Sequence, residues 1–175
     1  FDLRGEKYMK DERLPKQLGD FGEQLMTFII GRIYGHRVAC VDHVGADLIA
    51  TGNDGKRYAI SVKSRVFETD GPQHLFDKNQ QDKLEDFANS FGLVPAVAFV
   101  SIDKIDVTKD VNIDTYILEL EDFRRLAKEE ISGITATGFN GEVLHFSNAP
   151  ANQYAIQNNK DINFNRLVLK ACSDK

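Results

Sequence analysis

Cysteine is scarce in this sequence, and its spacing excludes the usual cysteine-based sites. Cys40 and Cys172 are the two cysteines among 175 residues, and no CxxC spacing occurs. Two thiols so far apart in the chain favour free cysteines over a metal clip or a redox pair. The sequence therefore indicates a reducing compartment.

Histidine clusters and long apolar runs are also lacking. Four histidines are scattered without HExxH or HxH spacing, namely His36, His43, His74 and His145. They predict no zinc site and are interpreted as structural or solvated. No stretch of about 18 apolar residues occurs, and the first residues lack the apolar segment of a secretory signal. These absences predict a cytoplasmic chain with no membrane contact.

The composition that remains is that of an ordinary globular protein. Its length allows one domain, residues 1–175, to bury an apolar core without disulfides or a structural metal. The net charge of −5 means that the average surface does not attract nucleic acid. Binding of a phosphate backbone would therefore need a local basic patch.

Hydrophobic periodicity in the first third of the chain predicts one helix followed by three strands. Apolar residues recur at helical spacing up to a stop at Gly35, which predicts a helix over 14–34; they are Leu14, Leu18, Phe21, Leu25, Phe28 and Ile29. Short β-type runs follow at 37–41, 47–51 and 58–66. The turn residues 52–55 (Gly-Asn-Asp-Gly) predict a hairpin between the last two.

The rest of the chain continues the α/β pattern. A helical face at 84–91 is closed by Gly92, and the apolar run 94–102 predicts a strand buried on both faces. Because that strand follows a helix, we expect a crossover and a mixed sheet. Further strands are expected at 115–120, 142–146 and 162–169, with a helix at 121–130. The charged run 103–114 and the amide-rich run 152–159 are expected to be loops.

Four residues in the first half carry chemistry in a recognisable order. Glu23 lies inside the first helix and Asp47 begins the second strand. The period of two on the third strand sends Ser61 and Lys63 to the same face. Taken singly, these residues are more often surface or turn residues, so their order along the chain is what indicates a site.

This order resembles the core of the PD-(D/E)XK nuclease superfamily, especially the archaeal Holliday-junction resolvases and the Mrr-like restriction endonucleases. The resemblance is carried by the segments GDFGEQL (19–25), GADLIA (45–50), ISVKS (60–64) and LEDFA…VPAVAF (84–99). It implies an α/β fold with a restriction-endonuclease-like core at about 14–103, a central mixed β-sheet flanked by helices. Residues 104–175 would then be a C-terminal elaboration of strands and a helix.

The resemblance also implies a catalytic site for hydrolysing phosphodiester bonds. Asp47 would be the central ligand of Mg²⁺ or Mn²⁺, Glu23 would hold the ion directly or through water, and Lys63 would orient the attacking water or stabilise the phosphoryl charge. The expected partner is DNA, double-stranded or branched. A homodimer is also allowed, since nucleases of this fold often dimerise to cut two strands.

Ser61 departs from the family pattern, which expects an acid or sometimes Gln at that position. A neutral hydroxyl is a poor metal ligand, so the site would bind one ion weakly, with help from a backbone carbonyl near Val62, or not at all. Glu68 and Asp42 are candidate replacement acids, but both fall out of phase if the strands are regular.

Three hypotheses about function therefore stay open. The first is a divalent-metal-dependent DNA endonuclease of restriction or repair type. The second is a catalytically inactive nuclease-fold module that binds nucleic acid or a protein partner, and the third is an unrelated α/β domain. Basic residues lie near the hairpin and the second helix, including Lys63, Arg65 and Lys83. They would either form a groove for phosphates or be ordinary surface charge.

Overall fold

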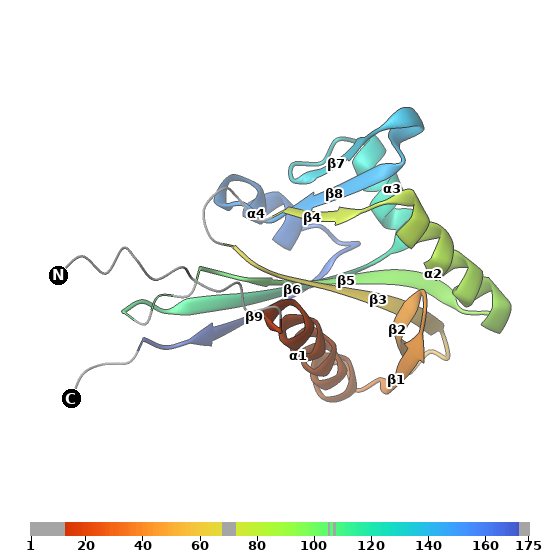
Figure 1. Ribbon diagram of the computed structural model, residues 1–175, viewed down its shortest axis with the longest axis horizontal. Coiled ribbons are helices and arrows are strands. Elements are labelled where there is room, and N and C mark those ends of the chain that lie inside the picture. Colours follow the sequence, from red (N-terminus) through yellow and green to blue (C-terminus); the bar gives the residue numbers. More distant parts are fainter. Residues whose placement is uncertain (1–12, 68–72, 105, 107, 172–175) are drawn as a thin grey trace.

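Two β-sheets and the helices around them make up the fold, seen in a computed structural model that describes residues 13–67, 73–104, 106 and 108–171 (Figure 1). The central sheet has six strands in the order β1-β2-β3-β5-β6-β9. Their bounds are Arg37–His43, Ala46–Thr51, Arg57–Val66, Val94–Ile102, Val111–Glu119 and Asn163–Leu169. β3 and β5 pair in parallel and the other neighbours are antiparallel, so the predicted mixed sheet is confirmed.

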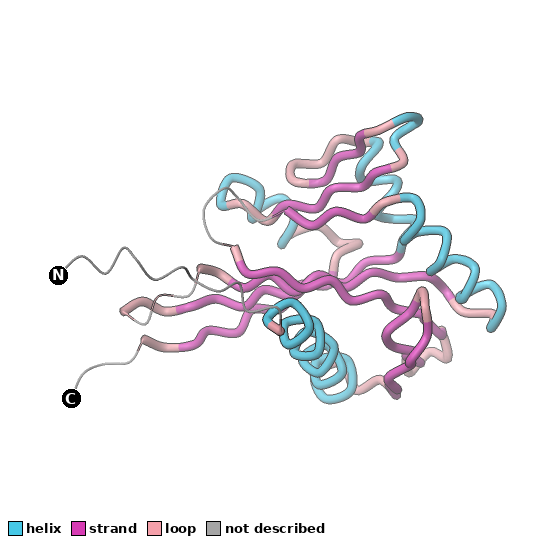
Figure 2. The backbone as a smooth tube through the Cα atoms, in the orientation of Figure 1, coloured by secondary structure: helices cyan, strands magenta, loops and turns pink. Residues whose placement is uncertain are grey.

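A second sheet of three short antiparallel strands lies over one face of the central sheet (Figure 2). Its strands are β4 (Gln73–Phe76), β8 (Val143–Ser147) and β7 (Ile134–Thr137), in that order. The sequence predicted β8 but not the other two. Both are only four residues long, which is too short for a clear alternating pattern.

The helices divide between the two faces of the central sheet. α1 (Leu14–Phe28) continues into η1 (Ile29–Ile33), a π-helical turn, and covers one face. α2 (Lys78–Phe91), α3 (Leu120–Lys128) and α4 (Pro150–Gln157) lie on the face that also carries the second sheet (Figure 1). A short 3₁₀ turn, η2, spans Phe139–Gly141. No helix in the described part of the chain is long and apolar enough to cross a membrane.

The hydrophobic core forms two layers, one on each face of the central sheet. Between α1 and the sheet lie Met26, Ile29, Ile30 and their partners from β2, β3, β5 and β6. The other layer is rich in aromatic rings, and in it the rings of Phe99 and Phe146 stack with their centres 4.4 Å apart. The predicted α/β class with a helix-flanked mixed sheet is therefore confirmed.

The structure corrects two predicted loops. Strand β6 begins at Val111, inside the run 103–114, because Val111 and Ile113 are buried against the α1 side of the sheet. Helix α4 covers most of the amide-rich run 152–159: Pro150 stands in its first turn and Ile156 anchors it in the core. Tyr154, Ala155 and Ile156 are consecutive, so apolar residues do not recur at helical spacing in this run and gave no helical pattern.

The structure also corrects which face of α1 is buried. Leu14, Phe21 and Phe28 are 57%, 42% and 55% exposed, although they were assigned to the apolar stripe. Gly22 and Met26 are the buried positions of the helix. The absence of a side chain at Gly22 allows α1 to approach β3 closely, since a Cβ there would stand 1.8 Å from Ser64 Oγ. This approach brings the next residue, Glu23, to the sheet.

Candidate active site

The strands β2 and β3 diverge where the predicted site residues lie. Their paired register ends at Leu48 and Ile60. Beyond that pair, the Asp47 carboxylate accepts a hydrogen bond from the Val62 backbone N–H, with 2.6 Å between Oδ2 and N. A side chain therefore takes the place of a strand partner, which fixes Asp47 at the opening between the two strands.

Asp47, Ser61 and Lys63 line one cavity of about 190 Å³ between the sheet and the first turn of α2. This confirms the expected shared face of Ser61 and Lys63. The Lys63 ammonium lies 5.7 Å from the centre of the Phe76 ring on β4, within range of a cation–π contact. Ser61 is only 6% exposed, so its side chain is held against the wall of the cavity.

Glu23 approaches Asp47 from the α1 side and is not part of the cavity lining. Partial burial raises the pKa of the Glu23 carboxyl, and the negative charge of Asp47 raises it further. Smaller contributions to this rise in pKa come from the charge of Asp20, from a hydrogen bond with Asp47 and from the charge of Asp42. Two carboxyl groups in such proximity repel each other when both are ionised, which favours a shared proton or a bound cation.

Asp42 lies on the Glu23 side and does not replace the missing acid at Ser61. β1 changes register between Cys40 and His43, so the assumption of a regular strand was wrong at this point. The irregularity nevertheless leaves Asp42 outside the cavity, whose lining contains Asp47 as its one acid among the described residues. Glu68, the other candidate, lies outside the described residues.

Two further polar residues that were not predicted as catalytic line the cavity. Gln80 and Lys83 both come from α2. Gln80 belongs to a capping box: its backbone N–H donates to the Asp77 carboxylate, and its side-chain oxygen accepts from the Asp77 backbone N–H. The spacing Asp-x-x-Gln before a helical run would have located this first turn from the sequence.

The histidines do not add to this cavity. His74 is buried beside Phe99, and its Nε2 lies 2.9 Å from Ser101 Oγ. Burial lowers the pKa of His74 to about 3, with further lowering by the charges of Arg65 and Lys63. It is therefore neutral at physiological pH, as expected of a structural histidine. Cys40 is a free, exposed thiol, whereas Cys172 lies outside the described residues.

The donor set of the site fits a hard divalent cation in part. Asp47 and Glu23 offer carboxylate oxygens, the ligands that Mg²⁺ and Mn²⁺ prefer. Among the described residues, however, no group of three or more His, Cys, Asp or Glu side chains could hold a metal ion. The pair of carboxylates therefore suits an ion that takes its remaining ligands from water or substrate.

Comparison with known proteins gives a distant likeness. No known protein family matches the sequence, and no curated protein is similar to it. Among solved structures, the chain is similar to a Holliday junction resolvase from the archaeal hyperthermophile Archaeoglobus fulgidus. The identity is 16%, the match covers 74% of this chain and 83% of that chain, and the TM-score is 0.49. At this level of similarity, the function of the site has to be argued from its own residues.

Proposed function

We propose that this chain is a divalent-metal-dependent DNA endonuclease with a PD-(D/E)XK-type site. The observation that carries the proposal is the place of Asp47, which interacts with Glu23 on the α1 side and shares a cavity with Lys63 on the other side. Two carboxylates beside a lysine are the groups that hydrolysis of a phosphodiester needs.

Each residue has a defined part in this proposal. Asp47 and Glu23 hold the ion, and the Val62 N–H fixes one oxygen of the Asp47 carboxylate. Lys63, held over Phe76, donates a hydrogen bond to the phosphoryl group and balances its charge. When bound, the ion supplies charge neutralisation at the phosphoryl group and lowers the pKa of water. Ser61 adds no negative charge, so weak ion binding is expected.

A cleavage assay tests this proposal. We expect Mg²⁺ or Mn²⁺ to support cutting of supercoiled plasmid or branched DNA, and Asp47→Asn or Lys63→Ala to reduce the rate by at least about 100-fold, as for loss of a transition-state contact. Lys104→Gln, which changes an exposed lysine far from the cavity, is the control and should cut at the parental rate. Cutting that survives both site substitutions would exclude this assignment.

A second candidate function is favoured by one observation, the neutral Ser61 in a cavity with one acid among its described lining residues. In that case the chain is an inactive nuclease-fold module that binds nucleic acid or a protein partner. It predicts no cleavage with any divalent ion and DNA binding that survives Asp47→Asn. Measurement of cleavage and binding on the same protein samples separates the two candidates.

A homodimer is the assembly that double-strand cutting would favour. The mass in solution, measured by light scattering at several concentrations, tests this prediction. A mass of one chain at all concentrations, with double-strand cutting retained, would contradict it.

A further inference from the structure

The cavity beside α2 contains more hydrogen-bond donors than a metal site needs. Its polar lining comprises the Ser61 hydroxyl, the Gln80 amide, the ammonium groups of Lys63 and Lys83, and the Asp47 carboxylate. Asp47 already accepts a hydrogen bond from Val62 through one of its oxygens. Two positive charges therefore face one negative charge that is partly satisfied, and such a balance favours an anion.

The Gln80 side chain is oriented so that its amide nitrogen, a hydrogen-bond donor, is left to bind a ligand. Its side-chain oxygen accepts from the Asp77 backbone N–H at 3.0 Å. The amide nitrogen is therefore the remaining polar group of the side chain. Gln80 also stands in the first turn of a 14-residue helix, where the partial positive charge of the helix dipole adds to the two lysines.

Both lysines line the cavity. Among the described residues, neither Lys63 nor Lys83 forms an ion pair. Lys83 is kept close by Gly45, where a Cβ would stand 2.4 Å from the Lys83 backbone oxygen. The turn between β1 and β2 thus packs directly on α2, and the φ of +124° at Gly45 permits this contact.

Asp47 separates this basic cavity from an acidic side. Glu23 and Asp20 belong to α1, and together with Asp42 they lie outside the cavity lining, where Asp20 and Asp42 are near enough for their charges to act on Glu23. An acid at position 61 would carry negative charge into the basic cavity and neutralise Lys63. Serine at that position instead adds a donor and leaves the positive charge uncompensated.

We infer that this cavity binds a phosphate group in the absence of any metal ion, with Ser61, Lys63, Gln80 and Lys83 as hydrogen-bond donors. The inference rests on the proposed function for its natural ligand, a phosphate of DNA, whereas the binding itself requires no cleavage. Ser61 is thus a phosphate-binding residue.

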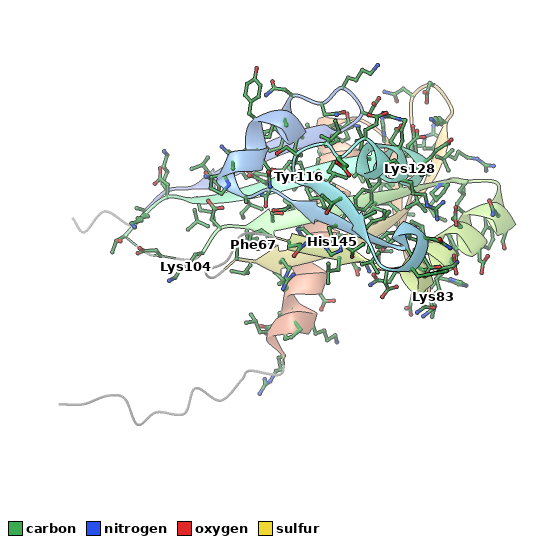
Figure 3. The ribbon with its side chains drawn as sticks, turned by 90° about the horizontal axis from the view of Figure 1, so that it is seen from above. Phe67, Lys83, Lys104, Tyr116, Lys128 and His145 are labelled. Carbon is green, nitrogen blue, oxygen red and sulfur yellow. The ribbon has the colours of Figure 1, made fainter. Side chains whose placement is uncertain are left out.

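Calorimetric titration with inorganic phosphate, in EDTA and at constant ionic strength, tests the inference. Saturable binding at one site is expected. Lys63→Gln and Lys83→Gln should each weaken it by about tenfold or more, since each removes a charge-assisted hydrogen bond. Ser61→Glu should abolish it and increase Mn²⁺ binding. The matched control is Lys104→Gln, because Figure 3 shows Lys104 and Lys83 at opposite ends of the molecule.

The natural source of the phosphate is decided by competition with short oligonucleotides. If a 5′-phosphorylated strand displaces inorganic phosphate better than the same strand with a 5′-hydroxyl, the cavity holds a terminal phosphate. If the two strands compete equally, it holds a phosphodiester of the backbone. Failure of both strands to compete would overturn the inference.

The inference and the endonuclease proposal can fail separately. Phosphate binding that depends on Lys63 and Lys83 in a chain that cuts no DNA supports the inference and excludes the endonuclease. Metal-dependent cutting without any phosphate binding in EDTA supports the endonuclease and overturns the inference. The inference is also overturned if Ser61→Glu changes phosphate binding no more than the control Lys104→Gln does. Circular dichroism of each variant establishes that it is folded.

Discussion

At the scale of single residues, the site places charges where they oppose each other. Glu23 is partly buried beside Asp47, and its pKa is raised above the ordinary value of 4.5. A raised pKa means that the folded chain holds the proton more tightly than the unfolded chain does. Stability therefore falls as the pH rises from about 4.5 through the raised pKa, and above it the whole penalty applies.

Removal of the Glu23 charge should recover this stability at neutral pH. We predict that Glu23→Gln raises the free energy of unfolding at pH 7, by less than about 1 kcal/mol because solvent around the half-buried side chain screens its charge. At a pH well below the ordinary pKa of 4.5 the gain should vanish, because the Glu23 carboxyl is then protonated in the folded and in the unfolded chain. Urea unfolding at several pH values measures the effect.

Asp86→Asn provides the comparison, because Asp86 is an exposed acid on α2. It should change stability little at either pH. An equal gain from both substitutions would indicate relief of the net negative charge of the chain rather than of the Glu23–Asp47 contact.

At the scale of elements, the docking of α1 on β3 decides whether Glu23 reaches the site. Gly22 and Gly19 lie in the same helix but differ in surroundings: a Cβ at Gly22 would meet Ser64, whereas a Cβ at Gly19 would meet nothing within 4 Å. A matched pair of alanine substitutions therefore separates packing from helix propensity.

We predict opposite effects for the two glycines. Gly19→Ala should stabilise the chain by about 0.5–1 kcal/mol through helix propensity alone. Gly22→Ala should destabilise it by about 1–3 kcal/mol, because the helix must move away from Ser64. Thermal unfolding of both variants measures the difference. Stabilisation by Gly22→Ala would show that α1 does not rest closely on β3.

The same scale shows why some elements could be predicted from the sequence and others could not. β5 was predicted with its observed bounds because a continuous apolar run is buried on both faces. The shared face of Ser61 and Lys63 followed from strand periodicity, which no long-range contact alters. β4 and β7 were missed because each has only four residues, and β4 also has its partner β8 far along the chain.

The sequence predicts Glu23, Asp47, Ser61 and Lys63 as members of the candidate site, but it does not predict the charge balance of the cavity. The order of Glu23, Asp47 and Lys63 along the chain indicated the site. Lys83 lines the same cavity where Gly45 packs closely on α2, a contact between two segments that no local pattern reveals. The separation of acidic and basic sides by Asp47 likewise depends on three-dimensional packing.

At the scale of the whole molecule, the two halves of the chain depend on each other. The predicted core, 14–103, and the predicted elaboration, 104–175, share both sheets: β5 pairs with β6, and β4 pairs with β8. They also share the aromatic layer, in which Phe99 packs against Phe123 and Phe146. Removal of the second half would expose this layer and leave β4 without its strand partner.

We therefore predict that a chain ending at residue 103 does not fold alone. It should show no cooperative thermal transition and should expose apolar surface, because a core shared between two halves cannot form from one of them. Calorimetry of the shortened chain beside the full chain measures this. A cooperative transition in the shortened chain would contradict the prediction that residues 1–175 form one domain.

The central claim is that carboxylates and lysines distant in sequence meet at the opening between β2 and β3. An anomalous difference map from a crystal soaked with Mn²⁺ and phosphate tests it most directly. The expected result is a manganese peak between the Asp47 and Glu23 carboxylates and a phosphate beside Ser61, Lys63 and Lys83. Manganese bound away from both carboxylates, with Lys63 facing a different surface, would contradict the account.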